Sequence, residues 1–131
     1  MGMWGLGVFQ NDDAGDWSDQ LLRGSNLDPV LSAFSEVIDN EEYLELPESC
    51  AGLAAAEVVA ALRGNVGADL PNKISVWILS HSISVDDKLV ETAKDVVGKI
   101  RNDSELQGLV EDTGRLSQWY EILADLNSRL R

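Results

Sequence analysis

Cysteine and histidine are almost absent from this sequence. Cys50 and His81 each occur once among 131 residues. A lone cysteine cannot close a disulfide within the chain, and one cysteine with one histidine cannot build the usual structural zinc sites. Because a single thiol suits a reducing compartment, we expect a cytoplasmic protein in which Cys50 is a small buried apolar residue.

Basic residues and long apolar runs are also scarce. The chain has 10 Lys and Arg against 23 Asp and Glu, a formal net charge of −13. Most of its surface should therefore repel nucleic acid and anionic lipid. The longest apolar run, 51–62, contains Glu57 and is too short to span a bilayer, and the opening residues lack the positive charge of a signal peptide. We expect no nucleic-acid partner and no membrane partner.

The common motifs for cofactors and catalysis are missing as well. The sequence has no phosphate-binding P-loop, no GxSxG and no HExxH. Residues 11–17 are rich in aspartate but lack the spacing of a calcium loop. We therefore expect no cofactor and no resident metal, and a non-enzymatic protein is the favoured interpretation.

The most distinctive stretch is 1–17, where glycines alternate with bulky apolar residues and lead into aspartates. Its motif residues are Trp4, Gly5, Gly7, Phe9, Asn11 and Trp17, with Gly2 preceding them. Glycines in this pattern indicate turns or close approaches that a side chain would block. The simpler interpretation is that Trp4, Phe9 and Trp17 plug the core while Asn11, Asp12 or Asp13 caps a first helix. The alternative is that the motif forms a binding site.

Apolar residues recur with helical spacing along the rest of the chain. Expected helices cover roughly 12–23, 26–39, 47–63, 71–82, 85–101, 104–113 and 115–130. Stretch 71–82 also alternates like a strand, but a lone strand has nothing to pair with. The prediction is an all-α, single-domain orthogonal bundle of six or seven short helices over 1–131, with an extended or turned N-terminal segment.

Two features of these expected helices bear on function. Glu57 lies in the apolar helix 47–63, so it must point out through a gap or be paired inside. A structural hydrogen bond to a loop N–H, a tryptophan indole or an arginine is the simpler outcome, and a functional acid is the alternative. The last helix carries a leucine-rich seam that suits internal packing or dimerisation, with Asp125 and Arg129 on its exposed side. We expect a monomer or a weak homodimer.

The acidic charge is concentrated near the N-terminus. Residues 10–45 contain ten acids and one base, Arg23, whereas residues 46–131 have a net charge of only −4. The candidate binding residues are Asp12, Asp13, Asp16, Asp19, Glu41 and Glu42. Asp12, Asp16 and Asp19 share one helical face, which a solvated surface would also explain.

These observations favour a non-enzymatic, acidic protein-interaction module, such as an inhibitor or immunity-type protein acting on a basic partner. The main alternative is a metal-dependent hydrolase or small-ligand enzyme in which Asp12, Asp13, Asp16 and Glu57 surround a magnesium-type ion. Mimicry of DNA by the acidic surface is a weaker third hypothesis.

The quoted motifs also resemble those of a known family. The opening MGxWGxGxF, followed by NDDA and DW, resembles the start of a bacterial family of small acidic proteins described only as a domain of unknown function. The stretches AAAEVVAALRG and DSELQGLVED, with Trp119 downstream, extend the similarity over nearly the whole chain. This chain has Val110 where relatives often carry tryptophan. The resemblance implies that the N-terminal motif residues act together, and it implies no particular activity.

Overall fold

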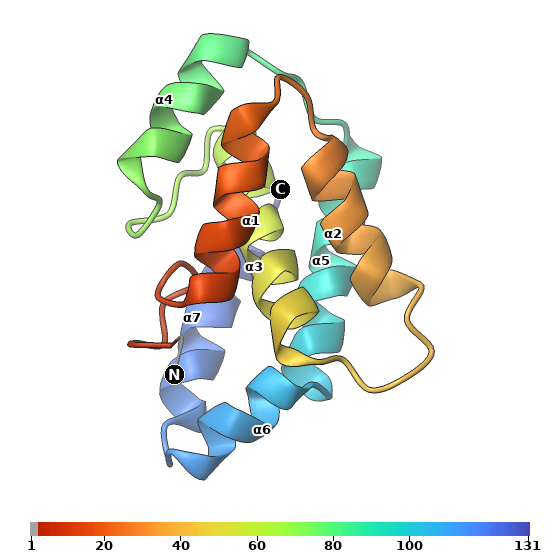
Figure 1. Cartoon of the computed structure of the whole chain (residues 1–131), viewed down its shortest axis with the longest axis vertical. Coiled ribbons are helices and arrows are strands. Elements are labelled where there is room, and N and C mark those ends of the chain that lie inside the picture. Colours follow the sequence, from red (N-terminus) through yellow and green to blue (C-terminus); the bar gives the residue numbers. More distant parts are fainter. Residues whose placement is uncertain (1–2) are drawn as a thin grey trace.

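The computed structural model describes residues 3–131, and within that range the chain forms seven α-helices joined by short connections (Figure 1). They are α1 (Asp12–Arg23), α2 (Asp28–Ile38), α3 (Leu46–Leu62), α4 (Asn72–His81), α5 (Asp87–Asn102), α6 (Glu105–Asp112) and α7 (Leu116–Arg129). The ambiguous stretch 71–82 is helical, as expected. The predicted all-α helical bundle is confirmed.

Local sequence signals explain where the central helices begin and end. The side-chain oxygen of Asn11 accepts the backbone N–H of Ala14 at 2.8 Å and caps α1. Of the three caps that the sequence left open, Asn11 is therefore the one used. Pro47 lies in the first turn of α3, where its missing N–H costs no hydrogen bond, and Gly64 follows the helix with a φ of 88°.

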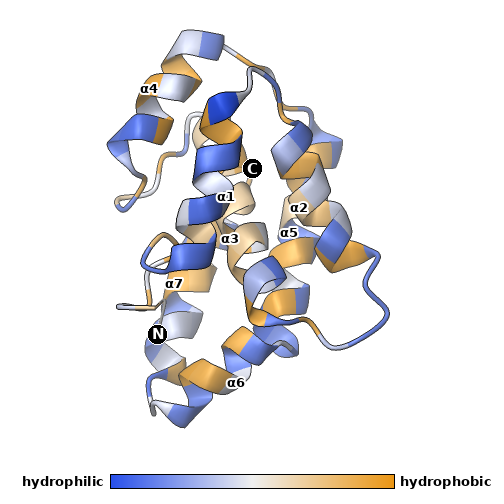
Figure 2. Ribbon diagram, in the orientation of Figure 1, coloured by the Kyte–Doolittle hydropathy of each residue, from blue (hydrophilic) through white to orange (hydrophobic). Residues whose placement is uncertain are grey.

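Helix α3 is the centre of the bundle and contacts every other helix. Apart from Glu48 in its first turn and Glu57, its residues are mostly apolar on every side, and Figure 2 shows most of it in pale to orange tones while α1 carries mostly hydrophilic residues on its outer side. Ala54, Ala55 and Ala60 are fully buried, and such small side chains let the surrounding helices approach closely. The buried apolar residues of the helices form one cluster around α3.

The other helices surround α3 on several sides. In the view of Figure 1, α1 and α2 lie in front of α3 and α5 lies behind α2, while α6 and α7 close the lower end. Helix α4 lies at the upper edge and contacts only α1 and α3 among the helices. In the described part of the chain, no helix combines the length and the apolar character needed to cross a bilayer.

The leucine-rich seam of α7 packs inside the protein. Trp119, Leu123 and Leu126 are buried, and so is Leu130, which follows the helix. The seam is therefore used for internal packing and offers no free face for a partner helix. The expectation that Arg129 lies on the exposed side of α7 is wrong, because its side chain is only 16% exposed and points to α3.

Candidate functional site at the N-terminal loop

The residues before α1 form a loop, 3–11, that we call the N-terminal loop. An antiparallel bridge joins Met3 to Asn11, and the Trp4 N–H donates to the carbonyl of Gln10 at 3.1 Å. Within the loop, the Gln10 N–H donates to the carbonyl of Gly7 at 3.0 Å. These bonds bring the chain back to the start of α1. Asn11 is both the last residue of the loop and the N-cap of the helix. Gly2 lies outside the described residues.

The side chain of Gln10 fixes the inside of this loop. Its Oε1 accepts the Gly7 N–H at 2.9 Å, which leaves no room for side chains at the neighbouring glycines. A Cβ on Gly7 would lie 2.7 Å from that oxygen, and one on Gly5 would lie closer still. The close approach to the glycines that the sequence indicated is therefore made by the far end of the flexible, exposed side chain of Gln10, a group that sequence reasoning missed.

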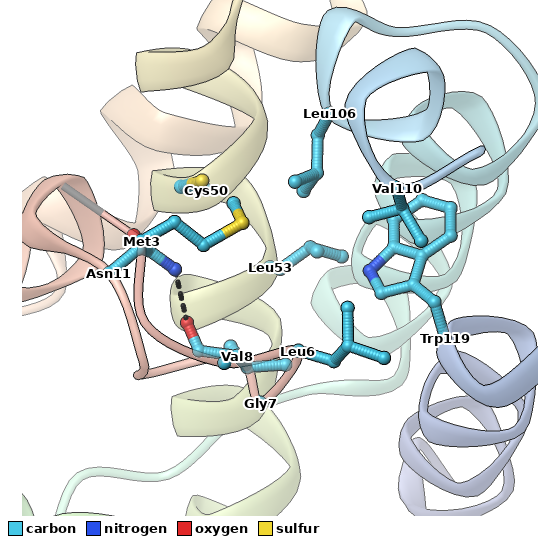
Figure 3. A pocket seen from close by; sticks show the side chains of 11 residues that line it. Met3, Leu6, Gly7, Val8, Asn11, Cys50, Leu53, Leu106, Val110 and Trp119 are labelled. Atoms are coloured by element: carbon cyan, nitrogen blue, oxygen red, sulfur yellow. Dashed lines mark hydrogen bonds between the residues drawn. The ribbon is translucent and has the colours of Figure 1, made fainter. Parts of the chain in front are cut away.

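One side of the N-terminal loop packs into the bundle. Figure 3 shows Leu6 directed toward Trp119 and Met3 ending beside Cys50, and both line one small space together with Val8 and Leu53. The cavity left between them is about 10 Å³, which is room for one water molecule at most. This inner side of the loop is thus packed against α3, α6 and α7 and has no space for a ligand.

Cys50 borders the same small space and is 1% exposed. Burial raises the pKa of its thiol to about 12, with smaller contributions from the charges of Asp13 and Glu105. The thiol is therefore protonated and unreactive at neutral pH. The sequence prediction of a buried apolar cysteine is confirmed.

The aromatic residues of the motif separate into inner and outer groups. Trp17 is 5% exposed and donates its indole N–H to the Pro29 carbonyl at 3.0 Å, while Phe9 is half-buried against the core. Trp4 is 65% exposed. The prediction that Trp4 plugs the core is wrong, because the hairpin-like path of the loop turns Leu6 and Val8 inward and leaves the indole outside.

Two grooves flank the exposed Trp4, and Arg115 borders both. The first, of about 470 Å³, is lined mainly by apolar residues that include Leu46, Leu109 and Val110, and we call it the apolar groove. The second, of about 610 Å³, is wide and open, and we call it the polar groove. Its polar lining comes from Gln10, Asp69, Arg115, Gln118 and Glu121.

The candidate binding carboxylates lie on the surface in two groups. Asp12, Asp16 and Asp19 are exposed along α1, and Asp13 beside them is half-buried. Burial raises the pKa of Asp13, and the charges of Asp16 and Asp12 raise it further. The exposed pair formed by Glu41 and Glu42 lies in the connection between α2 and α3, which projects from another part of the surface in Figure 1.

Glu57 has a structural partner. It is 5% exposed and forms a two-pronged ion pair with Arg129, whose Nη2 and Nη1 lie 2.6 and 3.0 Å from its two oxygens. Arg129 also donates Nε to Asp125 at 2.9 Å, and its pKa is raised, chiefly by the hydrogen bond to Glu57. Of the partner types that the sequence suggested for Glu57, an arginine is the one found.

The loop after α3 closes this ion pair. The side-chain amide of Asn65 donates to the Arg129 carbonyl at 2.9 Å. A Cβ on Gly67 would lie 2.6 Å from an oxygen of Glu57, so the backbone there covers the pair directly. We call Glu57, Asn65, Gly67 and Arg129 the α3–α7 clasp.

The proposed ion site of Asp12, Asp13, Asp16 and Glu57 does not form. Glu57 is bound to Arg129 inside the bundle, whereas Asp12 and Asp16 face solvent on α1. Across residues 3–131, no three carboxylate, histidine or cysteine side chains are placed to hold a metal ion. Helical spacing predicted the α1 stripe correctly, but the position of Glu57 relative to it depends on tertiary packing.

The fold and the surface together define a small all-α protein with exposed carboxylates along α1 and an exposed tryptophan between two grooves. The chain belongs to the family described as Domain of unknown function (DUF4259), whose sequence model matches residues 2–121. The matched range includes the N-terminal loop and α1. No curated protein and no solved structure matches the chain.

Proposed function

We propose that this protein is a non-enzymatic interaction module, of inhibitor or immunity type, that binds a basic protein partner through its acidic N-terminal side. The observation that carries the proposal is a set of carboxylates on α1, on α2 and in the connection between α2 and α3 that form no ion pair among the described residues, and we call this set the acidic side. It comprises Asp12, Asp13, Asp16, Asp19, Asp28, Glu36, Asp39, Glu41, Glu42 and Glu45, and all except the half-buried Asp13 are exposed.

Several basic residues of the chain have partners other than the carboxylates of the acidic side. Among residues 3–131, Arg63, Lys94 and Arg129 form ion pairs with Asp87, Glu91, Glu57 and Asp125, and no carboxylate of the acidic side forms one. Lys99 donates to the carbonyls of Val37 and Asn40 at the end of α2. The ten carboxylates of the acidic side outnumber the cations beside them, which include Arg23 of α1 and Lys99, so most of their charge is left for an external group.

Such a charge distribution favours binding because it orients the approaching partner and raises the rate of association. A negative surface speeds the encounter with a basic partner, and it does so less as salt screens the charges. The same surface repels nucleic acids, so a basic protein is the macromolecule it suits best.

The test compares two triple variants with equal changes in net charge. Asp12, Asp16 and Asp19 are replaced by asparagine in the first, and the exposed Asp95, Asp103 and Glu111 of the C-terminal half are replaced by their amides in the second. Partners are captured from a lysate of the source organism at low and high salt and identified by mass spectrometry. We expect the wild-type protein and the second variant to retain one basic protein at low salt and the first variant to lose it.

Three results would contradict the proposal. They are the absence of any specifically retained protein, retention that high salt does not weaken, and equal losses in the two variants. The last result would mean that net charge alone, and not the acidic side, attracts the partner. Both variants should unfold within about 0.5 kcal/mol of the wild type, because exposed substitutions away from special contacts change stability little.

A further inference from the structure

Trp4 differs from every other tryptophan of the chain. Trp17 and Trp77 are 5% exposed and Trp119 is 2% exposed, and the first two donate their indole N–H groups to backbone carbonyls. Trp4 is 65% exposed and is held outside the bundle by a loop with its own hydrogen bonds. An exposed tryptophan on a fixed support is the residue type that most often anchors protein–protein contacts.

The charges beside Trp4 are unbalanced toward the negative. The polar groove carries the exposed carboxylates of Asp69 and Glu121, and neither forms an ion pair among the described residues. Among the described residues that line it, the one cation is Arg115, whose Nε donates to the side chain of Gln118 at 3.0 Å. A cationic side chain entering this groove would meet two carboxylates next to an indole ring.

The apolar groove on the other side of Trp4 suits a different group. Leu6, Leu46, Leu109 and Val110 line it, together with Met3, and they leave a volume of about 470 Å³. This space is larger than one apolar side chain needs. Trp4 therefore separates a place for a cation from a place for an apolar group.

We propose that Trp4 and its two grooves form a docking site for one basic segment of a protein partner. An arginine side chain of that segment stacks on the indole ring and donates hydrogen bonds to Asp69 and Glu121, while a neighbouring apolar side chain enters the apolar groove. The proposal rests on the proposed function, since it assumes a basic partner. It adds a place of contact beyond the carboxylates of the acidic side, and it specifies the chemistry of the segment that binds there.

Arginine fits this site better than lysine does. Its planar guanidinium stacks on aromatic rings and presents several N–H donors in one plane, so it can contact the indole and the carboxylates together. The apolar neighbour explains why the site combines a tryptophan with leucine and valine. A site that bound its partner by charge alone would need neither the tryptophan nor these apolar residues.

The probe is a capped hexapeptide of alternating arginine and leucine, and binding is measured by calorimetry on the full chain. The matched control peptide carries citrulline, the neutral isostere of arginine. We expect the arginine peptide to bind the wild type, the W4A variant to bind it about tenfold more weakly, and D69N/E121Q to weaken it by about tenfold as well. D95N/D103N removes two charges far from the loop in sequence and should change the affinity less than twofold.

Substitution of Arg115 should have the opposite effect on the affinity for the arginine peptide. R115Q removes the one cation that the described residues bring to the polar groove, so the arginine peptide should bind two- to fivefold more tightly, an effect of about 0.5–1 kcal/mol at an exposed site. The proposal is overturned if the wild type does not bind the arginine peptide, if it binds the citrulline peptide equally well, or if W4A and D69N/E121Q bind like the wild type. Circular dichroism of each variant confirms that it is folded.

The two proposals fail in different ways. If the wild type and W4A capture the same basic protein from the lysate equally well, the docking site is wrong and the proposed function stands. If the wild type captures no basic protein, the proposed function fails whatever the peptide does.

Discussion

The α3–α7 clasp and the N-terminal loop with α1 differ in whether their charged side chains are paired and buried or unpaired and exposed. In the clasp, the buried Glu57 meets Arg129 through two hydrogen bonds, and the side chain of Asn65 closes the pair. On α1, Asp12, Asp16 and Asp19 remain exposed and unpaired among the described residues. The ion pair of the clasp joins α3 to α7, two helices that are distant in sequence.

This difference indicates whether each set of residues contributes to the stability of the fold or to contacts outside the protein. A buried charge is tolerated only with a partner, so the clasp belongs to the stability of the fold. Exposed carboxylates and an exposed indole contribute little to stability, and their chemistry is directed at solvent or at another molecule. Changes in the clasp should therefore reduce stability, and changes on the N-terminal surface should spare it.

The largest expected effect is in the clasp. E57Q removes the charge partner of Arg129 and should lower the free energy of unfolding by about 3 kcal/mol, the loss typical of a broken buried pair. Urea denaturation followed by circular dichroism measures it. The control is E57L/R129M, which removes both charges and should recover much of the loss. If E57Q unfolds like the wild type, the ion pair does not hold α3 to α7.

The joint between the loop and α1 should give a smaller loss. N11A removes the oxygen that caps α1 and the amide that donates to the Val8 carbonyl at 3.2 Å. We expect a loss of about 1–2 kcal/mol in the free energy of unfolding. N11D keeps the cap and loses only the amide donor, so it should be less destabilised than N11A. Equal losses in the two variants would show that the cap is not the important contact.

A third effect should appear inside the N-terminal loop. G7A displaces the side chain of Gln10 and breaks the Gly7 N–H bond to it, at a cost of about 1 kcal/mol. Q10A removes the same bond. Because the methyl group of G7A would then have space, the double variant should cost less than the sum of the single losses. Additive losses in this cycle would show that Gln10 is not what requires a glycine.

The smallest effect concerns the pH dependence of Asp13. Its pKa in the folded protein lies above the reference value of 3.8, chiefly through burial and further through Asp16 and Asp12. The folded state then binds a proton more tightly than the unfolded state, so stability falls as pH rises through the interval above 3.8. In an NMR titration of the carboxyl groups, D16N should lower the pKa of Asp13 without restoring the reference value. A pKa of Asp13 below 3.8 in the wild type would contradict this assignment.

The helices were predictable because their signals are local. The spacing of apolar residues, with the helix-ending residues Gly24 and Gly64 and the helix-starting residue Pro47, located the helices to within a few residues. The burial of Cys50 and the pairing of Glu57 also followed from the apolar helix around them. An acid within such a helix needs a partner wherever the partner comes from.

The site was predictable only in part, because it depends on contacts between distant segments. The glycines indicated a close approach, but no pattern identified Gln10 as the approaching group. The sequence placed Arg129 outside through its spacing from Asp125, whereas packing turns it toward Glu57. Trp4 was predicted inside because large aromatic residues are usually buried, and only the path of the loop places it outside.

The central claim is that the folded protein keeps Trp4 uncovered while its other tryptophans are buried. Acrylamide quenching of native tryptophan fluorescence, compared between the wild type and W4F, tests this claim most directly. We predict that the wild type contains a readily quenched component and that W4F lacks it, with the remaining emission resistant until the protein unfolds. Equal quenching of the two proteins would contradict the claim, because Trp4 would then be as shielded as the others.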